Sequence, residues 1–364
     1  MGQAKKHILP FFIPHLGCPH QCIFCNQYHV SGSSGFPQDN EIAQAIQDWE
    51  RAELPEIAFY GGSFSGLDFS WQRYFLTPAY QALKENKISG IRISTRPDYI
   101  NPQVLAFLRS FGVATVELGV QSMDDQILAS AKRGHSAKEV LDALNLLKKE
   151  GFTTGVQLMP GLPGDNRAKC LQGALILARL QPDLARIYPT VVLKNTLLHK
   201  LFLEDSYQPL NLPEAVEISK DMLAIFRLFG VQVIRTGLQP TKDLAPGGEM
   251  VAGPFHPAFG ELVAAALVRE HLIFVINSFL KERDEKIIIL WGSPQDCSLI
   301  AGHKKSNMQF LQDHFQLSHI KIMGSSSLDR GNFGISMIDS DQPEFVVSEK
   351  HFLHQYVNQR LNLI

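Results

Sequence analysis

Short apolar runs and helical patterns alternate along the first two thirds of the chain. The apolar runs, rich in β-branched residues, lie at residues 8–14, 56–60, 91–94, 115–118, 154–159 and 184–192. The stretches with helical periodicity lie near residues 41–49, 71–85, 102–111, 137–150, 167–180 and 213–229. This alternation predicts a parallel sheet covered by helices, and residues 231–235 could add an edge strand.

Local signals support two of these helix boundaries. Asn101 followed by Pro102 is typical of a helix start, and Gly151 after two lysines is typical of a helix end. Six strand–helix units are fewer than the eight that close a full barrel. The polar motifs of the chain follow the ends of these strands, so we expect them to meet at one edge of the sheet.

The pattern changes after residue 240, where prolines and glycines interrupt the periodicity. A smaller α/β unit begins near residue 281, with strands expected at 286–291 and 319–323 and helices at 298–301 and 306–315. We therefore expect three segments: a partial barrel over residues 1–240, an extension and linker over 241–280, and a C-terminal domain over 281–364. The boundary is placed near residues 265–285.

The composition is that of an ordinary globular protein. Of 364 residues, 45% are hydrophobic and 19% are charged, and the net charge is −2. This balance gives no global attraction to nucleic acid. Prolines at positions 10 and 14 argue against a signal peptide, and no apolar run is long enough to span a membrane. We expect a cytoplasmic protein without membrane contact.

Three cysteines follow the first expected strand at the spacing Cys-x3-Cys-x2-Cys. Cys18, Cys22 and Cys25 could hold three corners of a [4Fe–4S] cluster and leave the fourth iron open to a ligand. Zinc is an alternative, with a fourth ligand from His15, His20 or His29, and plain burial is another. An odd total of 5 cysteines does not fit a disulfide framework.

The cysteine loop and the motifs after it resemble the radical S-adenosylmethionine (SAM) superfamily. The motifs are Gly17–Asn26, Tyr60–Phe64, Ser94–Asp98, Glu117–Ser122, Met159–Gly164, Ile187–Thr190 and Gly253–Leu262. In this order they resemble the branch of the Elongator catalytic subunit and, more distantly, the oxygen-independent coproporphyrinogen oxidases. The resemblance covers roughly residues 7–265. It implies a partial (β/α)6 TIM-type barrel, a [4Fe–4S] cluster, SAM, and a reductant such as flavodoxin or ferredoxin. The rest of the chain has no glycine loop typical of acyl-CoA binding, so acetyltransferase activity is not carried over.

The resemblance also assigns residues to SAM. Gly61, Gly62 and Ser63 would hold its methionyl amine, while Gln121 and Arg133 would contact its ribose and carboxylate. Without the motif, Arg133 would be interpreted as a solvated helix end. Related proteins often carry Glu where this chain has Ser94, and Thr95 or Asp98 could replace that carboxylate. Gln157 could bond a ribose hydroxyl or be a buried structural amide.

Four further residues could face the substrate, without an assigned role: Tyr60, Glu117, Tyr188 and Lys194. A core tyrosine and a lysine at a strand edge are the commoner explanations for such positions.

The C-terminal unit resembles a KH-like RNA-binding fold. Lys304 and Lys305 would contact phosphate from a turn that opens a helix, although Lys305 stands where that fold has its second glycine. A structural or dimerising lid is the alternative. We expect a radical SAM enzyme that acts on RNA, with a tRNA base as the group that reacts. The rivals are a radical SAM enzyme for a porphyrin-type small molecule and a non-enzymatic metal-binding protein.

Overall fold

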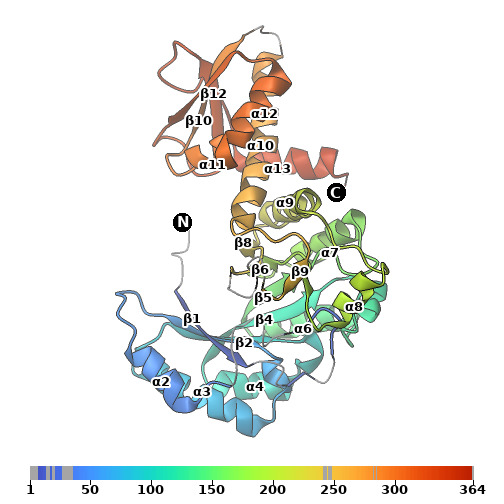
Figure 1. Ribbon diagram of the computed structural model, residues 1–364. Coiled ribbons are helices and arrows are strands. Elements are labelled where there is room, and N and C mark those ends of the chain that lie inside the picture. Colours follow the sequence, from blue (N-terminus) through green and yellow to red (C-terminus); the bar gives the residue numbers. More distant parts are fainter. Residues whose placement is uncertain are drawn as a thin grey trace.

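Seven parallel strands form one curved, open sheet whose spatial order follows the chain (Figure 1). The computed structural model describes residues 7–13, 17–18, 21–26, 36–240, 244, 248–281, 283 and 285–362. The six predicted strands and the predicted edge strand are all present, and the half-barrel class is confirmed. The strands are β1 (Ile8–Ile13), β2 (Glu56–Gly61), β3 (Gly90–Thr95), β4 (Val113–Gln121), β5 (Thr153–Leu158), β6 (Leu184–Ile187) and β8 (Gln232–Thr236).

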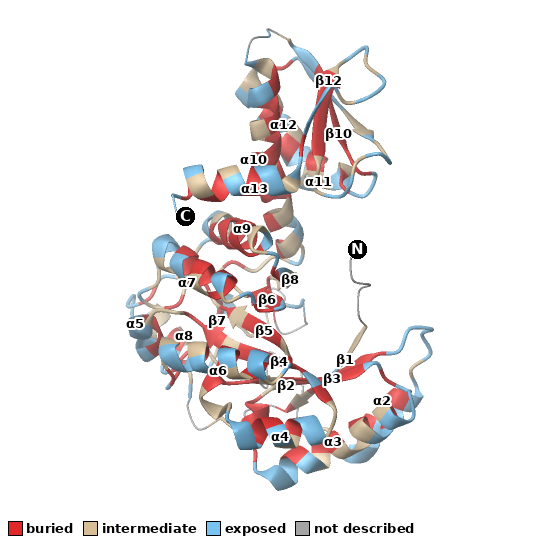
Figure 2. Cartoon of the chain, turned by 180° about the vertical axis from the view of Figure 1, so that it is seen from behind, coloured by how far each residue is buried: buried red, intermediate tan, exposed pale blue. Residues whose placement is uncertain are grey.

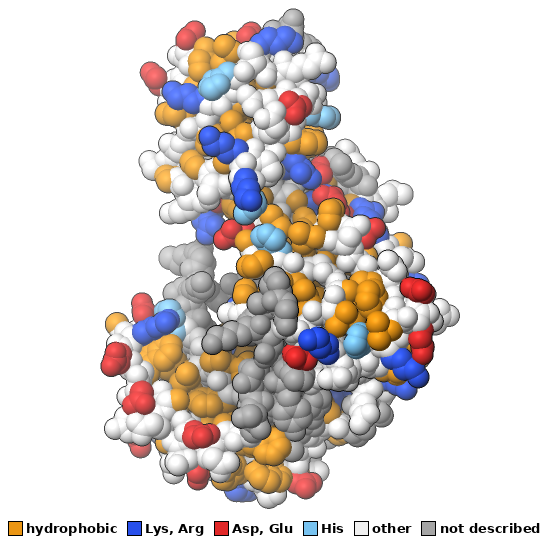
Figure 3. All heavy atoms as spheres, in the orientation of Figure 1, with side chains coloured by type: hydrophobic (Ala, Val, Ile, Leu, Met, Phe, Trp, Pro, Cys, Tyr) orange, Lys and Arg blue, Asp and Glu red, His pale blue; other side chains and the backbone are white. Residues whose placement is uncertain are grey.

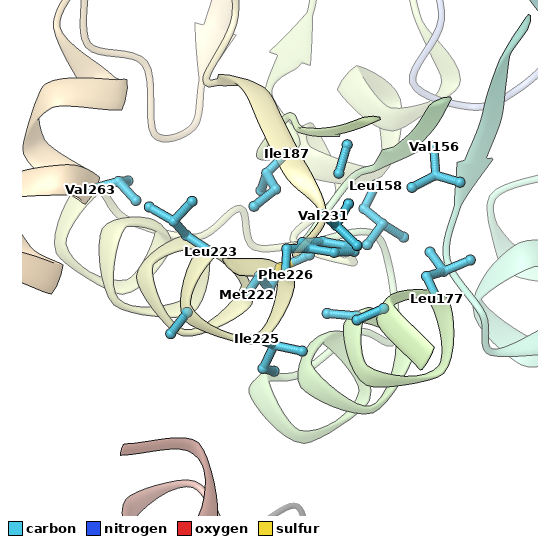
Figure 4. Packing of buried hydrophobic residues seen from close by; sticks show 14 of the residues in the cluster. Val156, Leu158, Leu177, Ile187, Met222, Leu223, Ile225, Phe226, Val231 and Val263 are labelled. Atoms are coloured by element: carbon cyan, nitrogen blue, oxygen red, sulfur yellow. The ribbon is translucent and has the colours of Figure 1, made fainter. Parts of the chain in front are cut away.

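Helices cover one face of this sheet and bury apolar side chains against it (Figure 2). Phe226 and Met222 of α9, for example, pack beside Leu158 of β5 and Leu177 of α7 (Figure 4). The helices of this part of the chain are α2 (Asp39–Gln47), α3 (Phe69–Lys84), α4 (Pro102–Ser110), α5 (Asp125–Ser130), α6 (Ala137–Lys149), α7 (Arg167–Arg179), α8 (Leu197–Leu203) and α9 (Leu212–Leu228).

The helix starts follow the local signals in the sequence. The side chain of Asn101 accepts a hydrogen bond of 3.0 Å from the N–H of Val104, and Pro102 occupies the first position of α4. Ser136 and Glu139 form a reciprocal capping box at the start of α6. These caps satisfy backbone donors that would otherwise be left without partners at the helix ends.

The sixth expected strand is shorter than predicted, which is a correction. We expected a strand over 184–192, but β6 ends at Ile187. Pro189 has no N–H to donate to a ladder, so a strand is interrupted there. Residues Val192–Leu193 form a separate strand, β7, which pairs antiparallel with β9 (Met250–Ala252).

A long helix, α10 (Phe259–Leu280), occupies residues that we assigned to the extension and linker. It contacts α9 and β8 of the half-barrel at one end, and α11, α12 and β12 of the C-terminal unit along the rest. Apolar residues lie on all its faces, so it lacks the one-sided pattern by which surface helices are recognised. No helix in the described ranges has the length and apolar character needed to cross a bilayer.

The C-terminal unit is a four-stranded mixed sheet with helices on one side (Figure 1). The expected strand–helix–turn–helix–strand order is present, and β12 and β13 were not predicted. The elements are β10 (Ile287–Gly292), α11 (Cys297–Ala301), the 3-10 turn η3 (His303–Lys305), α12 (Ser306–Phe315), β11 (His319–Gly324), β12 (Phe333–Met337), β13 (Phe345–Val347), α13 (Glu349–Gln355) and the π-helical turn η4 (Tyr356–Arg360). The likeness to a KH fold stays a prediction.

Candidate active site

The cysteine loop lies beyond the C-terminal end of β1, against the segment that follows β2. Gly17 has a φ of +71°, and a Cβ at this position would collide with the carbonyl oxygen of Ser63. The loop can therefore approach the β2 turn only with glycine here. Cys18, Cys22 and Cys25 are half-buried, and none of them forms a disulfide. The histidines considered as a fourth ligand, His15, His20 and His29, lie outside the described residues.

One buried side chain fixes the middle of the loop. Ile23 is 2% exposed and packs in an apolar cluster with Ile127 and Leu162. Its N–H donates to the carbonyl of Ala131 at 3.2 Å, and its own carbonyl accepts from the N–H of Leu198 at 2.8 Å. The loop is thus attached to the regions after β4 and β7, which places its cysteines at the edge where the strands end.

Gly61 and Gly62 bring the end of β2 against the end of β1. Gly61 has a φ of +104°, and the N–H of Gly62 donates to the carbonyl of Ile13 at 2.9 Å. The Ser63 hydroxyl is 2.9 Å from the Thr95 hydroxyl, so it holds β2 and β3 together. The backbone N–H of Ser63 lies against the Cys18 thiol.

Arg133 reaches the cysteine loop from the region after β4. It is 6% exposed, so the interpretation as a solvated helix end is wrong. Its Nη1 donates to the sulfur of Cys22 at 3.2 Å and its Nη2 to the carbonyl of Gly119 at 2.6 Å, while its Nε is buried without a partner. Gln121 lies nearby with a φ of +70°, and its Oε1 is also buried without a partner. These buried polar atoms are free to bind a polar ligand next to the cysteines.

Arg96 is a residue of this region that the sequence analysis missed. It is 3% exposed, pairs with Asp98 through three hydrogen bonds of 2.9, 3.0 and 3.4 Å, and keeps its Nη1 buried without a partner. Burial and the neighbouring Cys22 raise the pKa of the Cys18 thiol, and the positive charges of Arg133 and Arg96 act in the opposite direction. A thiolate at Cys18 therefore depends on these two cations or on a metal. Thr95 and Asp98 are both engaged within the protein.

The face of the sheet opposite the helices, here called the inner face, collects the other polar candidates. Strand pairing places Ser94 beside Glu117 and Gln157 beside Arg186. Paired residues of parallel strands point to the same face. Neither the Ser94 hydroxyl nor the Gln157 side-chain amide has a hydrogen-bonding partner among the described residues. Both groups are therefore available on the inner face.

A buried network of charges, here called the inner-face network, crosses four strands. Arg92 bonds Glu56 and Glu117, each at 2.7 Å, and Arg186 bonds Glu117 at 2.5 Å. Burial disfavours the Glu117 carboxylate, but Arg186 and Arg92 outweigh burial and lower its pKa. Arg92, Arg186 and Glu56 were not singled out from the sequence. Their signal is a single charged residue in each of these otherwise uncharged strands.

Two tyrosines extend this network. Tyr60 donates to Glu117 at 3.1 Å and accepts from Arg186 at 2.8 Å, and Tyr188 accepts from Arg186 at 3.0 Å. Burial, followed by the Glu117 charge, raises the pKa of Tyr60, so its phenol stays protonated. Lys194 is not part of this group, because its amine donates to the carbonyl of Gly248 at 2.7 Å.

Lys304 and Lys305 project from the C-terminal unit. Both are exposed, and both have left-handed backbone angles, with φ of 51° and 63°. The ring of the preceding residue, His303, contacts His256 of the half-barrel extension, with centroids 5.7 Å apart. The lysine turn therefore lies at the junction of the two units, where basic and histidine side chains gather (Figure 3).

Family models match two consecutive parts of the chain. Residues 12–172 match the radical SAM superfamily, and residues 182–269 match the radical SAM C-terminal domain. The chain belongs to the radical SAM superfamily. It is therefore an enzyme of a superfamily that binds a [4Fe–4S] cluster and SAM, rather than a non-enzymatic metal-binding protein.

The curated relatives belong to the expected branch. The "tRNA uridine(34) acetyltransferase" of Dehalococcoides mccartyi (strain CBDB1) is 29% identical over 53% of this chain and 50% of its own length. The "Elongator complex protein 3" of Homo sapiens is 27% identical over 51% of this chain and 38% of its own length. The chain thus matches half or less of the length of these relatives.

A solved archaeal structure supports the fold. It is the Elp3 of Methanocaldococcus infernus with an N-terminal deletion, and it covers 73% of this chain and 63% of its own chain. The TM-score is 0.61 and the identity 23%. At this identity the likeness concerns the fold alone.

The described residues fit the two cofactors. Three thiols from one loop are the donor set of a cluster with an open iron. The unpartnered atoms of Gln121, Arg133 and Arg96 provide donors and an acceptor beside the cysteines. The SAM carboxylate could pair with an arginine at this place.

Proposed function

We propose that this chain is a cytosolic radical SAM enzyme whose substrate is RNA, with a tRNA base as the group that reacts. Cys18, Cys22 and Cys25 would hold the cluster. The observation that carries this proposal is that the thiol loop and the unpartnered atoms of Arg133 and Gln121 meet at the edge of a polar inner face.

The residues at the strand ends would bind SAM. The backbone of Gly61 and Gly62 would hold the methionyl amine, and Arg133 and Gln121 would contact the carboxylate and ribose. The hydroxyl of Ser63 is engaged with Thr95, so Ser63 would contribute its backbone only. Ser94 and Gln157, which have no partners in the described part of the chain, would bond SAM or the substrate from the inner face.

The cluster, when bound, supplies the electron that splits SAM into methionine and a 5′-deoxyadenosyl radical, with flavodoxin or ferredoxin as the proposed reductant. The protein side of the reaction is positioning and exclusion of water. The buried Ile23 closes the loop from one side. Tyr60 and Tyr188 line the inner face with phenols that can hold a substrate by hydrogen bonds or ring contact. Glu117 and Arg186 keep Tyr60 in place.

Two observations support RNA as the substrate class. The relatives named above are a tRNA uridine(34) acetyltransferase and an Elongator protein. In addition, Lys304 and Lys305 are exposed on a turn whose His303 touches the half-barrel extension. We propose that residues 281–364 form a separate RNA-binding domain, whose lysines contact phosphate.

Substrate-dependent cleavage of SAM tests this proposal. Reconstituted enzyme is supplied with SAM and dithionite under anaerobic conditions. The formation of 5′-deoxyadenosine is measured with a pool of unmodified tRNA transcripts, with the same RNA digested to nucleosides, with a porphyrinogen, or without addition. We expect intact tRNA alone to raise the rate and to acquire a mass change. A rate that rises with a porphyrinogen but not with tRNA would replace RNA by a small molecule.

A double substitution probes the C-terminal lysines. Lys304→Ala with Lys305→Ala should weaken tRNA binding by about tenfold. Each lost phosphate contact lowers the number of counterions that are released on binding, and this release favours the complex. The apparent Kd is measured by filter binding at several salt concentrations. Unchanged affinity and salt dependence would assign the C-terminal unit to structure or dimerisation.

A further inference from the structure

Arg235 lies on β8, the strand at the open edge of the half-barrel (Figure 1). Its pairing partner is Arg186 of β6, although the register of the two strands shifts just before this pair. Because paired residues of parallel strands share a face, Arg235 belongs to the inner face, next to the inner-face network. The neighbouring pair, Ile187 and Thr236, belongs to the opposite face, where Ile187 packs in the core (Figure 4).

The charges on the inner face are balanced without Arg235. The sequences of the seven strands contain five charged residues: Glu56, Arg92, Glu117, Arg186 and Arg235. The first four pair with one another as two acids and two bases. Arg235 is half-buried and has no hydrogen bond, ion pair or ring contact within the described ranges. Among the described residues, the inner face therefore carries one positive charge without a counter-charge.

A half-buried guanidinium loses part of its hydration and gains most from an anion that accepts two parallel hydrogen bonds. Given that the substrate is RNA, as proposed above, we infer that Arg235 binds a backbone phosphate of the RNA at the open edge of the half-barrel. The base next to this phosphate would enter the inner face, where Tyr60, Tyr188 and Gln157 lie. Arg235 thus positions the substrate and does not take part in the radical step.

The position of the lysine turn agrees with this path. Immediately after β8, Gly237 packs against Phe259 at the start of α10, and α10 in turn contacts the lysine turn η3. The side chain of Asn307, at the start of α12, donates to the carbonyl of Ala265 in α10 at 2.9 Å. The ring of His303 in this turn contacts His256, which precedes α10 along the chain, so the two lysines lie close to the segment that connects β8 with α10. An RNA strand bound at Arg235 would run from β8 toward this turn.

The test compares Arg235→Gln with wild type and with Arg179→Gln, in the reconstituted holoenzyme. Arg179 is exposed at the end of α7, in the helix layer outside the sheet, so its substitution removes the same charge far from the inner face. For a pool of unmodified tRNA transcripts we expect Arg235→Gln to raise the apparent Kd roughly tenfold and to lower the salt-dependence slope by about one phosphate equivalent. Arg179→Gln should leave both values at the wild-type level.

A second measurement locates the contact. A single-stranded RNA is made in versions that each carry one neutral methylphosphonate linkage, and the Kd ratio of variant to wild type is determined for every version. If Arg235 binds one phosphate, the ratio falls to about one for a single linkage and is unchanged for the others. Arg235→Lys should keep the salt slope and lose part of the affinity, because lysine retains the charge without the planar fork.

The outcomes separate two failures. If wild-type enzyme binds no RNA, both the RNA substrate and this inference are overturned. If wild type binds RNA and Arg235→Gln behaves like Arg179→Gln, the RNA substrate stands and only this inference is overturned. A loss of folding is not expected, because the side chain has no partner to lose, and the thermal unfolding midpoint of each variant verifies this.

Discussion

The rim of the half-barrel is the edge where the strands end and the cysteine loop lies. The rim and the inner-face network both contain buried charged side chains, but these side chains differ in how many of their polar atoms have hydrogen-bonding partners. At the rim, Gln121, Arg133 and Arg96 each keep a buried polar atom without a partner. In the inner-face network, each charged side chain bonds another, and the Nε of Arg92 is the one unpartnered atom there among the described residues. Burying a polar atom without a partner costs free energy, so an enzyme keeps such atoms where a ligand binds them. From this comparison we propose that the rim binds the ligand and that the network supports the fold.

Loss of one cysteine should have the largest effect at the rim. Cys22→Ala removes the thiol that accepts from Arg133, and we expect anaerobically reconstituted protein to lose nearly all its cluster and all SAM cleavage. Iron and sulfide content and 5′-deoxyadenosine formation are the measurements. Cys297→Ala in the C-terminal unit is the matched control and should behave like wild type. If Cys22→Ala has the same colour and iron content as Cys297→Ala, Cys22 is not a ligand of the cluster.

Removal of Glu117 should have the largest effect on stability. Glu117→Ala leaves Arg92 and Arg186 buried without their shared carboxylate, which is expected to destabilise the fold by about 3–5 kcal/mol. Glu204→Ala, which breaks an exposed pair with Lys200, should cost less than about 1 kcal/mol. Urea unfolding compares the two. If Glu117→Ala is as stable as the control yet binds no substrate, the network belongs to the binding site and the comparison fails.

His271 provides an exception that sharpens the comparison. Its Nε2 is buried without a partner, yet it lies between Phe333 and Phe352 in the C-terminal unit, far from the rim. Burial lowers its pKa from 6.5 to about 3. The unfolded chain therefore binds a proton between these values that the folded protein excludes, and stability falls as the pH drops below about 6.5.

The measurable consequence is a pH profile. Relative to His271→Leu, wild type should lose about 2 kcal/mol of unfolding free energy between pH 7 and pH 5. Urea unfolding at both pH values gives the difference, and SAM binding at pH 7 should be equal in the two proteins. Parallel pH profiles would mean that His271 titrates normally, and a loss of SAM binding would contradict its placement away from the site.

Arg133→Ala should have the smallest of these effects. We expect the cluster to remain and the SAM dissociation constant to rise roughly tenfold, as for the loss of one charge-assisted pair. Lys132→Ala, an exposed neighbour, serves as the control. Equilibrium binding of SAM to reconstituted protein distinguishes them. Equal affinities would show that the unpartnered Nε of Arg133 does not face SAM.

The sequence predicts those features that depend on neighbours along the chain. The strand–helix alternation, the Asn101 cap and the order of the motifs along the sheet edge are of this kind. Two predictions were wrong or incomplete, and in both cases the cause also lies in the local sequence. The strand expected over 184–192 ignored the missing donor of Pro189, and α10 was overlooked because apolar residues surround it on every side.

The inner-face network could not be predicted in detail, because it depends on contacts between distant strands. Glu117 was a candidate, but its partners Arg92 and Arg186 lie 25 and 69 residues away. Only the register of the folded sheet brings them together. The same holds for Arg235 and for the Nη1 atom of Arg96, because the folded chain decides whether each has a partner. A charged residue inside an otherwise apolar parallel strand is the signal that would have drawn attention to most of them.

The central claim is that three thiols of one loop hold an iron–sulfur cluster that binds SAM. The most direct measurement is analysis of anaerobically purified and reconstituted protein for iron, sulfide and zinc, together with the electron paramagnetic resonance spectrum of the reduced protein with and without SAM. The account predicts about four irons and four sulfides per chain and a spectrum that changes on addition of SAM. Zinc without sulfide, or a cluster whose spectrum ignores SAM, would contradict it.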